Sequence, residues 1–546
     1  MKKPPPKTAR NIDKYLFEAG QQCQKRLWLD VHKPAKDAAG DTRLVLSVVG
    51  EQLRTLARSA FPKGVTIEAA TTARAAEETK KQLAAGTPVL FGATFVADGV
   101  EVVSDILVQH KSPGSDDPKS GDAKSGDAKS SDAKSSPSLV DLYEVKSGTK
   151  IKHRYVNDLA LQVHAVEHSG HRLRAAFLLH VNPKYVHKEG ADFPPMQLLR
   201  SADVTAKVQK QVELVRRRLQ QFRRSLVDDN VLQLPMGTFC TTPFPCPHFA
   251  RCSAEAPERP LRELPELSRA LELELHKEGI EDFAGLDEKR PGLTFRQRRA
   301  LACVQQNAPI IETFVRDELR QCSEPLHFLS IAALTDALPR FEGQRPWRQI
   351  PYAWAANTLH PDGRLETASF VHVERTDPRT EFITTLAKHL EVGGTIVCWD
   401  DEALSELRSL LDDLPAAKVA VRAVLGRAHV DMMKLFESGL FYPNLLDYSD
   451  LRATAKALLD DDSGAELAIF GEDTLRAALS KAATPRIRST TKDKIAAEIK
   501  SGVSWASEQL LRLFRKFGEV EAQVPRPTAV KARTASKPLP KPLPKE

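Results

Sequence analysis

A run of aliphatic and β-branched residues between positions 88 and 147 constrains the fold of this chain more than any other feature. TPVLFGATFVADGVEVV predicts a hairpin that turns at residues 97–99. VSDILVQH and SLVDLYEVKSG predict further strand segments on either side of residues 112–138. That segment repeats a degenerate Asp/Lys/Ser-rich pentapeptide, which predicts a solvated, disordered insert at a hairpin tip. We therefore expect three or four neighbouring strands.

The strand DLYEVKSG carries an acid and a base at alternate positions. Alternate side chains of a strand share a face, so Glu144 and Lys146 are predicted to point the same way. A surface salt bridge on an edge strand is the alternative explanation of an isolated E-x-K triplet. Asp105 is predicted on the paired strand, and two adjacent buried acids need a compensating charge. Mg²⁺ or Mn²⁺, which prefer oxygen ligands, would supply that charge.

The order Asp105, then E-x-K, then Gln162 in the following predicted helix resembles the PD-(D/E)XK nuclease superfamily in its RecB-like branch. The resemblance implies an α/β nuclease core in which Asp105 and Glu144 bind the metal ion. It also implies that Lys146 is the catalytic lysine and that Gln162 positions water or the backbone. The predicted function is metal-dependent hydrolysis of phosphodiester bonds.

Two further positions bear on the resemblance to that branch: one fits its pattern and one departs from it. Glu51, in the predicted helix SVVGEQLRTLARSAFPKG, falls where the branch often places another metal ligand. A glutamate on the solvent-facing side of a helix is the alternative. The Q-x-x-x-Y continuation of the branch is not kept, because Val166 stands where the tyrosine is expected.

Seven cysteines, in a chain that begins without a secretory signal, argue against a disulfide framework. Cys23 and the C-x5-C-x5-C spacing of Cys240, Cys246 and Cys252 resemble the iron–sulfur-stapled RecB-like nucleases, which include AddB-type helicase-nucleases and CRISPR adaptation exonucleases. The resemblance implies a [4Fe–4S] cluster. Zn²⁺ is the alternative, although its usual signature is two close C-x2-C pairs. His248, inside the loop, is predicted to be a surface residue, with a substitute ligand of the cluster as the alternative.

The second half of the chain resembles a bacterial family named for domain of unknown function 2779, on the stretch PRFEGQRPWRQIPYAWA at residues 339–355. The resemblance implies an RNase H-like 3′–5′ exonuclease fold. Ser330 and Ala332 stand where the first strand of the family carries metal-binding acids, and Trp399 replaces an asparagine. Asp431 alone matches a catalytic acid. One carboxylate does not hold two metal ions, so we expect an inactive exonuclease-like domain.

Charge gives little evidence for a nucleic-acid-binding body. The net charge is +7, of which residues 1–10 carry +4 and residues 524–546 carry +5, so the remainder is −2. Contacts to phosphate must then come from local patches. Arg345 and Arg348 are the candidates in the second half.

The predicted protein is a DNA nuclease, acting on single strands or ends, with an RNase and a non-catalytic nucleic-acid-binding scaffold as alternatives. No apolar run approaches the ~18 residues of a membrane span, so a cytoplasmic protein is expected. The predicted fold class is α/β: a PD-(D/E)XK core and a second RNase H-like domain joined by a helical connector. The predicted segments are a basic tail (1–10), the nuclease domain (11–257), the connector (258–324), the exonuclease-like domain (325–460), a helical region (461–523) and a disordered Pro/Lys tail (524–546).

Overall fold

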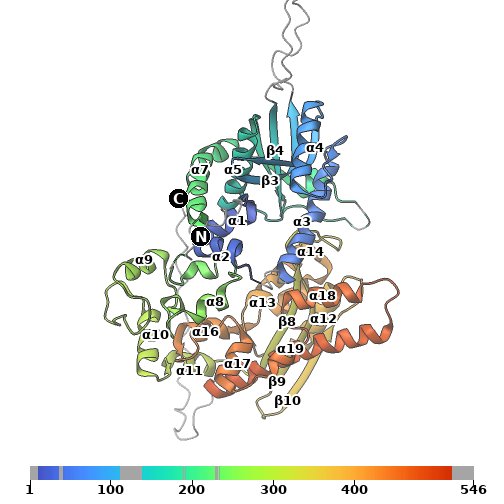
Figure 1. The fold of residues 1–546 in the computed structure, drawn as a ribbon. Helices are drawn as coiled ribbons and strands as arrows, with labels where there is room; N and C mark the ends of the chain where they lie inside the picture. The colour runs from blue at the N-terminus through green and yellow to red at the C-terminus, as the bar shows by residue number, and fades with distance from the viewer. Residues whose placement is uncertain are drawn as a thin grey trace, which may run out of the picture.

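The computed structural model of the chain describes residues 10–35, 41–110, 138–188, 190, 192–227, 232 and 234–518. It is a mixed α/β structure in which two larger sheets, one in each half, are surrounded by helices (Figure 1). Residues 1–9, the insert up to residue 137 and the tail 524–546 lie outside the described residues. Among the helices that are described, none has both the length and the apolar character needed to cross a bilayer.

The first sheet has six strands that lie side by side in chain order. Strands β2, β3 and β4 are antiparallel to their neighbours in this series. Strand β5 is parallel to β4, because a helix crosses over between them. Ala97 pairs with Val100 around the turn, which confirms the predicted hairpin. The strands are β1 (Val65–Thr66), β2 (Val89–Ala97), β3 (Val100–His110), β4 (Leu139–Lys146), β5 (Arg172–Val181) and β6 (Leu199–Asp203).

Helices cover both faces of this sheet. On one face, Leu159 and Val163 of α5 pack with Leu219 and Phe222 of α7 over the strands, as the apolar stripes of these helices predict. On the other face, Leu53 of α3 packs in a separate apolar cluster. The helices are α1 (Lys14–Gln22), α2 (Gln24–His32), α3 (Asp41–Ser59), α4 (Thr72–Ala84), α5 (His153–His168), α6 (Pro195–Leu198) and α7 (Thr205–Val227).

The connector predicted at 258–324 contains short helices around a small apolar core of leucines and Phe283. A two-stranded antiparallel sheet ties it to the second half, because β7 (Ile310–Ile311) pairs with β13 (Leu440–Phe441). The helices of this part are α9 (Arg269–Lys277), α10 (Phe295–Gln306) and α11 (Thr313–Arg320), and the short helix α8 (Phe249–Ala254) precedes them.

The second large sheet has five strands in the order β10-β9-β8-β11-β12, so its first strand β8 is central. The long helix α19 lies along β8 and β9, and its Val503 and Ile499 pack with Ile350 of β9. The strands are β8 (Leu326–Thr335), β9 (Gln349–Leu359), β10 (Leu365–Val371), β11 (Thr395–Cys398) and β12 (Ala428–Asp431). The helices are α12 (Arg379–His389), α13 (Glu402–Glu406), α14 (Leu410–Asp413), α15 (Lys418–Leu425), α16 (Met432–Gly439), α17 (Leu451–Leu459), α18 (Glu472–Ala482) and α19 (Ser489–Gly518).

Strand β9 was not among the strands predicted from sequence. Pro351 lies inside it, and a proline inside a run of residues argues against a central strand because it donates no ladder hydrogen bond. The structure places Pro351 opposite Ala333, next to a shift in the β8–β9 register. The irregular pairing at this point accommodates the proline.

Candidate functional site

The candidate site lies where β3 and β4 stop pairing. Their last regular pair on this side is Ile106 with Tyr143. The next residues along the two strands are Asp105 and Glu144, and Oδ2 of Asp105 accepts a hydrogen bond from the N–H of Val145 at 2.8 Å. The Asp105 carboxylate therefore replaces a backbone acceptor of the ladder. Asp105 and Glu144 thus lie next to each other where the two strands separate.

Glu144 is held by three side chains. Its Oε1 accepts hydrogen bonds from Nζ of Lys146 at 2.7 Å and of Lys14 at 3.1 Å. Its Oε2 accepts a hydrogen bond from Nε2 of Gln162 at 2.8 Å. Burial of this side chain, which is 5% exposed, opposes ionisation, but the ammonium groups of Lys146 and Lys14 outweigh it. The pKa of Glu144 is therefore lowered, and Glu144 is a carboxylate at neutral pH.

Asp158 of α5 completes the cluster. Its Oδ2 lies 2.6 Å from Nζ of Lys146 and 2.5 Å from Nζ of Lys14. Burial lowers the pKa of Lys146, but the carboxylates of Asp158 and Glu144 together raise it by more than burial lowers it. The net shift of the pKa is therefore upward. Lys146 is thus a protonated ammonium group at neutral pH. It can stabilise negative charge but is a poor base.

Asp105 shows the opposite behaviour to Glu144. Burial and the nearby negative charge of Glu144 raise the pKa of Asp105 to about 7. Nε of Arg54 on α3 lies 3.9 Å from Oδ1 of Asp105, and the charges of Lys146 and Arg54 only partly oppose this rise. The protein itself therefore compensates the charge of Glu144 fully and that of Asp105 only weakly.

Two residues of this cluster also have a buried oxygen without a hydrogen bond. Oδ1 of Asp158 and Oε1 of Gln162 are buried, and neither accepts a hydrogen bond from a residue that the structure describes. Asp158 and Gln162 contact Lys146 and Glu144, respectively. Asp105 beside Glu144 has little compensating positive charge. Hard divalent cations such as Mg²⁺ and Mn²⁺ prefer oxygen donors, so the residues present fit the ion that the sequence implies.

Of the residues predicted from sequence, Asp105, Glu144, Lys146 and Gln162 are brought together. Glu51 is not part of their hydrogen-bond network. Its side chain is 54% exposed, and its carboxylate pairs with Arg54 at 2.8 Å and more weakly with Arg58, both on its own helix.

Sequence analysis missed Lys14 and Asp158. Lys14 lies 130 residues before Glu144 and belongs to α1, which sequence reasoning did not associate with the strands. Asp158 was open to detection, because it precedes Gln162 by four residues and so lies on the same face of α5.

The four cysteines predicted as cluster ligands lie in two segments that face each other. Cys23 separates α1 from α2, whereas Cys240, Cys246 and Cys252 lie in the turn, loop and short helix of residues 238–254. Burial raises the pKa of the Cys23, Cys240 and Cys246 thiols. Repulsion from the negative charge of the other cysteines of this set, Cys252 among them, adds to this effect.

The loop that carries these cysteines is anchored on the first two helices. Nε2 of Gln22 donates to the carbonyl oxygens of Phe239 at 2.7 Å and Phe244 at 2.8 Å. Nε2 of His248 lies 2.7 Å from Oδ1 of Asp30 in α2, and both side chains are buried. The prediction that His248 is a surface residue is therefore wrong. His248 braces the loop against α2 because its ring has a buried carboxylate partner there.

The thiols are more widely spaced than ligands of one tetrahedral ion. Zn–S bonds of ~2.3 Å place tetrahedral sulfur ligands about 3.8 Å apart. Among the described residues, no three of these four sulfur atoms lie within 4.8 Å of one another. The spacing leaves room for a group larger than one zinc ion.

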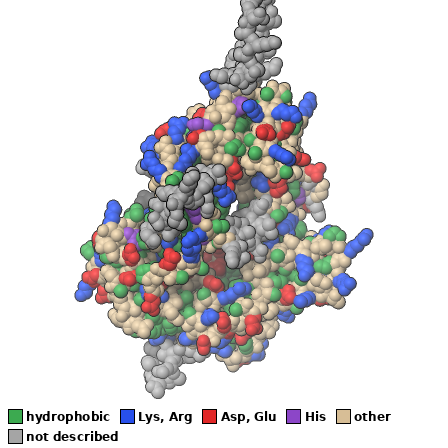
Figure 2. Space-filling model, in the orientation of Figure 1, with side chains coloured by type: hydrophobic (Ala, Val, Ile, Leu, Met, Phe, Trp, Pro, Cys, Tyr) green, Lys and Arg blue, Asp and Glu red, His purple; other side chains and the backbone are tan. Residues whose placement is uncertain are grey.

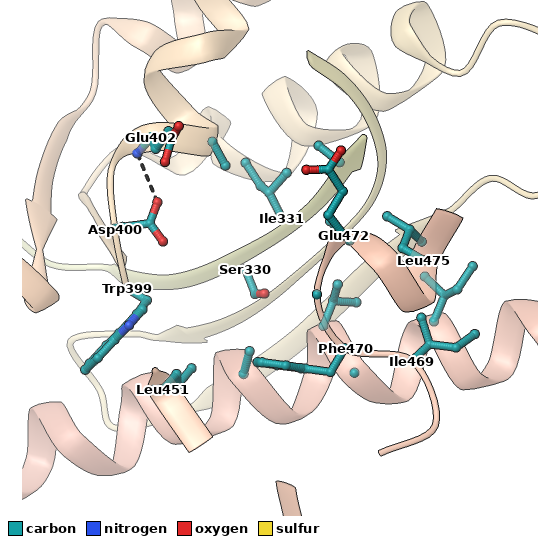
Figure 3. A pocket seen from close by; sticks show the side chains of 18 of the residues that line it. Ser330, Ile331, Trp399, Asp400, Glu402, Leu451, Ile469, Phe470, Glu472 and Leu475 are labelled. Atoms are coloured by element: carbon teal, nitrogen blue, oxygen red, sulfur yellow. Dashed lines mark hydrogen bonds between the residues drawn. The ribbon is translucent and has the colours of Figure 1, made fainter. Parts of the chain in front are cut away.

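A cavity of about 510 Å³ lies beside β8 and the end of β11 in the second half. Ser330, Ala332 and Trp399, the three positions where the sequence departs from the exonuclease pattern, all line it (Figure 3). The lining residues that the structure describes include no lysine, arginine or histidine. A bound polyanion would therefore meet no compensating charge from the cavity walls.

Three of the four acids that line this cavity accept hydrogen bonds from the backbone around it. Asp400 accepts a hydrogen bond from the N–H of Glu402, as Figure 3 shows, Asp450 from that of Arg452, and Glu472 from that of Thr335 at the end of β8. Asp400 and Asp450 thereby satisfy N–H groups at the starts of α13 and α17, where free N–H groups need acceptors.

Asp431, predicted as the one remaining catalytic acid, does not line the cavity. It is the N-cap of α16, and its carboxylate accepts hydrogen bonds from the N–H groups of Lys434 at 2.8 Å and Asp401 at 3.1 Å. Nζ of Lys434 also lies 2.8 Å from its Oδ2.

Arg345 and Arg348 lie close to a buried acid rather than apart on an open surface. Nη1 of Arg345 is 2.8 Å from Oδ1 of Asp413, whose side chain is 1% exposed. Burial raises the pKa of Asp413, and the charges of Arg348 and Arg345 partly oppose this rise. Part of the positive charge of Arg345 and Arg348 therefore compensates the buried carboxylate of Asp413.

The loop that carries these arginines joins the two halves. Nε1 of Trp347 donates to the carbonyl oxygen of Ser147, directly after Lys146, at 2.7 Å. The N–H of Gly343 donates to the carbonyl of His187, and the N–H of His187 donates to the carbonyl of Gln344. Trp347 also packs in the apolar cluster that contains Val145 of β4.

Residues 327–449 match the family model described as "Domain of unknown function (DUF2779)". The match confirms the prediction of that domain for this part of the chain, which runs from β8 into the segment after β13. No curated protein matches the chain at a significant level.

Proposed function

We propose that this chain is a metal-dependent nuclease with a PD-(D/E)XK-type core that hydrolyses DNA, with single strands or ends as its preferred substrates. The observation that carries the proposal is the convergence of Asp105, Glu144, Lys146 and Gln162 from two strands and a helix in one buried cluster. A surface salt bridge on an edge strand does not describe this arrangement, because β4 lies inside the sheet and Glu144 is buried.

Asp105 and Glu144 would hold the ion, and Oδ1 of Asp158 and Oε1 of Gln162 are further oxygen donors nearby. A bound Mg²⁺ or Mn²⁺ would act as a Lewis acid on the phosphate and would lower the pKa of a water molecule. Lys146, held between Glu144 and Asp158, presents a fixed positive charge where negative charge develops on the phosphate. Gln162 fixes the orientation of the Glu144 carboxylate through its hydrogen bond to Oε2.

Positive side chains near the first sheet support a nucleic-acid substrate. Lysine and arginine side chains gather on the upper left of the molecule, where α7 runs (Figures 1 and 2). Arg217 of this helix is 71% exposed. Phosphate contacts of this kind position a nucleic acid without reading its sequence, so they suit DNA and RNA equally.

The cysteine set would hold a [4Fe–4S] cluster that ties α1 and α2 to the end of the nuclease domain. The wide spacing of the thiols supports a cluster over a single Zn²⁺. The second half would be a degenerate RNase H-like exonuclease domain that binds or positions the substrate, because three of the four carboxylates of its cavity already accept hydrogen bonds from backbone N–H groups.

One observation favours a second candidate function, a nucleic-acid-binding scaffold without turnover. Lys14 and Lys146 neutralise Glu144 and Asp158 without any metal ion. A cluster that is stable in this form needs no catalytic ion to fold.

A Mn²⁺-dependent cleavage assay on single-stranded DNA, double-stranded DNA and RNA distinguishes these functions. We expect the parent to cleave DNA and the Asp105→Ala, Glu144→Ala and Lys146→Ala variants to lose at least 100-fold in rate, as loss of a catalytic group commonly does. Asp141→Asn is the matched control, because Asp141 is also buried on β4 but pairs with Arg174 and His110.

Cleavage of RNA alone would favour the RNase alternative. Binding of DNA without cleavage by the parent would favour the scaffold. If all three cluster variants cleave like the parent, the cluster is a structural ion-pair network.

A further inference from the structure

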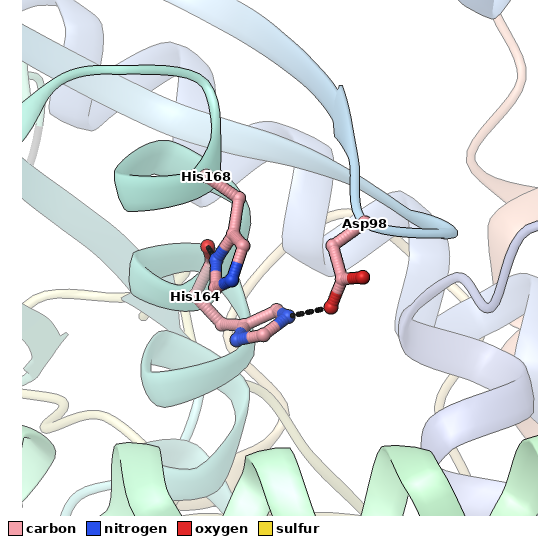
Figure 4. A group of neighbouring side chains, drawn as sticks. All are labelled: Asp98, His164 and His168. Carbon is pink, nitrogen blue, oxygen red and sulfur yellow. Dashed lines mark hydrogen bonds and ion pairs between the residues drawn. The ribbon is translucent and has the colours of Figure 1, made fainter.

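A second group of metal-ligating side chains lies away from the carboxylate cluster. Asp98 is in the β2–β3 turn, and His164 and His168 are one turn apart on α5, with ring centroids 4.1 Å apart. One potential ligand atom from each residue lies within 4.8 Å of the other two. Figure 4 shows the two rings next to each other on the helix and the carboxylate of Asp98 facing the ring of His164.

The hydrogen bonds of His168 prepare its ring for a ligand role. Its Nδ1 lies 2.7 Å from the carbonyl oxygen of His164, so Nδ1 carries the proton of the neutral ring. The lone pair of Nε2 is then available. A backbone carbonyl that fixes the tautomer in this way is the usual support of a metal-binding histidine.

His164 is fully buried, and its Nε2 lies 2.9 Å from Oδ2 of Asp98. Its Nδ1 is buried and has no hydrogen-bond partner among the described residues. When an ion displaces the proton of Nε2, Nδ1 is free to take that proton. The Asp98 side chain is 40% exposed, so the ion has access from solvent and room for water as a further ligand.

We propose that Asp98, His164 and His168 form a binding site for a divalent transition-metal ion of the Zn²⁺ type. Two imidazoles and one carboxylate suit Zn²⁺, whereas Mg²⁺ prefers oxygen ligands alone, so this site and the carboxylate cluster select different ions. The ion joins the hairpin that carries Asp105 to the helix that carries Asp158 and Gln162.

Arg223 of α7 competes with the ion. Its Nη2 donates to the main-chain carbonyl of Asp98 and lies 3.2 Å from Oδ2, the oxygen that also faces His164. Two neutral rings and one carboxylate leave a bound dication with a net positive charge, which the guanidinium repels. Removal of this guanidinium strengthens binding of the ion.

The test is a Zn²⁺ titration of the full-length protein in excess Mg²⁺, with a chromogenic chelator as competitor. Asp98→Asn is the main variant, because asparagine tolerates the positive φ of 45° at this turn and keeps the side-chain shape. We expect Asp98→Asn and His168→Ala to bind Zn²⁺ at this site at least tenfold more weakly than the parent. Arg223→Gln is expected to bind Zn²⁺ several-fold more tightly.

His153→Ala is the matched control, because it removes an exposed histidine from the same helix outside the proposed site. It is expected to bind Zn²⁺ like the parent. Thermal unfolding is the second measurement: Zn²⁺ should raise the Tm of the parent and of His153→Ala more than that of Asp98→Asn, because an ion bound to the native state stabilises it. Equal Zn²⁺ affinity and stoichiometry in the parent, Asp98→Asn and His168→Ala would overturn the proposal.

Discussion

Asp105 and Glu144 are neighbouring acids in one cluster, yet their pKa values shift in opposite directions. Both side chains are largely buried, and burial opposes ionisation of each. The difference arises because both lysines contact Glu144 directly, whereas the charges of Lys146 and Arg54 only partly offset the effects of burial and of Glu144 on Asp105. The negative charge of Asp105 is therefore the least compensated in the cluster. We expect pH and metal ions to change the stability of the protein mainly through this residue.

We predict that the protein without added metal loses stability as pH rises towards 8, and that Asp105→Asn removes this contribution. The pKa of Asp105 is raised from 3.8 to about 7 in the folded chain, so between these values the folded state binds more protons than the unfolded state. The free energy of unfolding then falls as pH rises through this window. Urea unfolding at pH 5 and pH 8 in EDTA measures the effect.

Glu51→Gln is the control for this prediction, because it alters an exposed acid outside the cluster and should keep the pH dependence of the parent. An Asp105→Asn variant with the same pH dependence as the parent would contradict the assignment. Mg²⁺ at pH 8 should stabilise the parent more than Asp105→Asn, since the ion replaces the missing charge.

The residues of this cluster were partly predictable. Strand alternation alone placed Glu144 and Lys146 on one face, and hairpin pairing placed Asp105 beside them. Lys14 was not predictable from a local pattern, because its contact depends on how α1 docks against α5 and the sheet. A contact between residues so far apart follows from packing rather than from spacing.

For Asp431 we predict that replacement by alanine leaves nuclease activity unchanged and lowers stability. The carboxylate caps α16 through the N–H of Lys434, and loss of such a cap costs about 1 kcal/mol. Cleavage rate and urea unfolding of Asp431→Ala are the measurements. A loss of cleavage without a loss of stability would instead give Asp431 a part in catalysis.

At the scale of elements, the cysteine loop is predicted to act as a staple between the start and the end of the nuclease domain. Protein purified without oxygen should be brown and contain iron, and Cys246→Ala should lose iron and unfold at a lower temperature. The loss should be mainly structural, because the loop contacts α1 and α2 through Gln22 and His248. Colourless protein with stoichiometric zinc would contradict the cluster.

The elements that were predicted correctly from sequence each have an uninterrupted apolar periodicity within their own segment. The β2–β3 hairpin turns where it was predicted, and α18 and α19 lie within the helical region predicted at 461–523. Strand β9 was missed because Pro351 breaks the usual signature of a central strand, and its compensation lies in the pairing with β8. The register shift that accommodates Pro351 lies in the pairing with β8, so the sequence of β9 alone does not reveal it.

At the scale of the whole molecule, the stretch at 339–355 does more to join the halves than to present charge. Its arginines suggested phosphate contacts by Arg345 and Arg348, and in the structure Arg345 pairs with buried Asp413. We predict that Arg345→Ala lowers stability because it removes the closer of the two ion-pair partners that the structure describes for that acid and leaves it Arg379 at 3.9 Å. Arg348→Ala tests phosphate binding more directly: it should weaken DNA binding and reduce its salt dependence.

Trp347 gives the sharpest test of communication between the halves. Its indole N–H holds the carbonyl of Ser147, the residue after Lys146, and its ring packs with Val145. Trp347→Phe keeps an aromatic ring but removes the donor, so we expect a loss of about 1 kcal/mol in stability and a lower kcat, because the end of β4 is less firmly held.

The matched control is Trp505→Phe. Trp505 is also largely buried, and its Nε1 donates to Oγ of Ser463 at 2.9 Å, far from β4 in the second half. It should lose a similar amount of stability without a change in kcat. Equal effects of the two replacements on kcat would mean that the second half supports the first only through global stability. A selective effect of Trp347→Phe would mean that the second half sets the position of Lys146 in the proposed nuclease site.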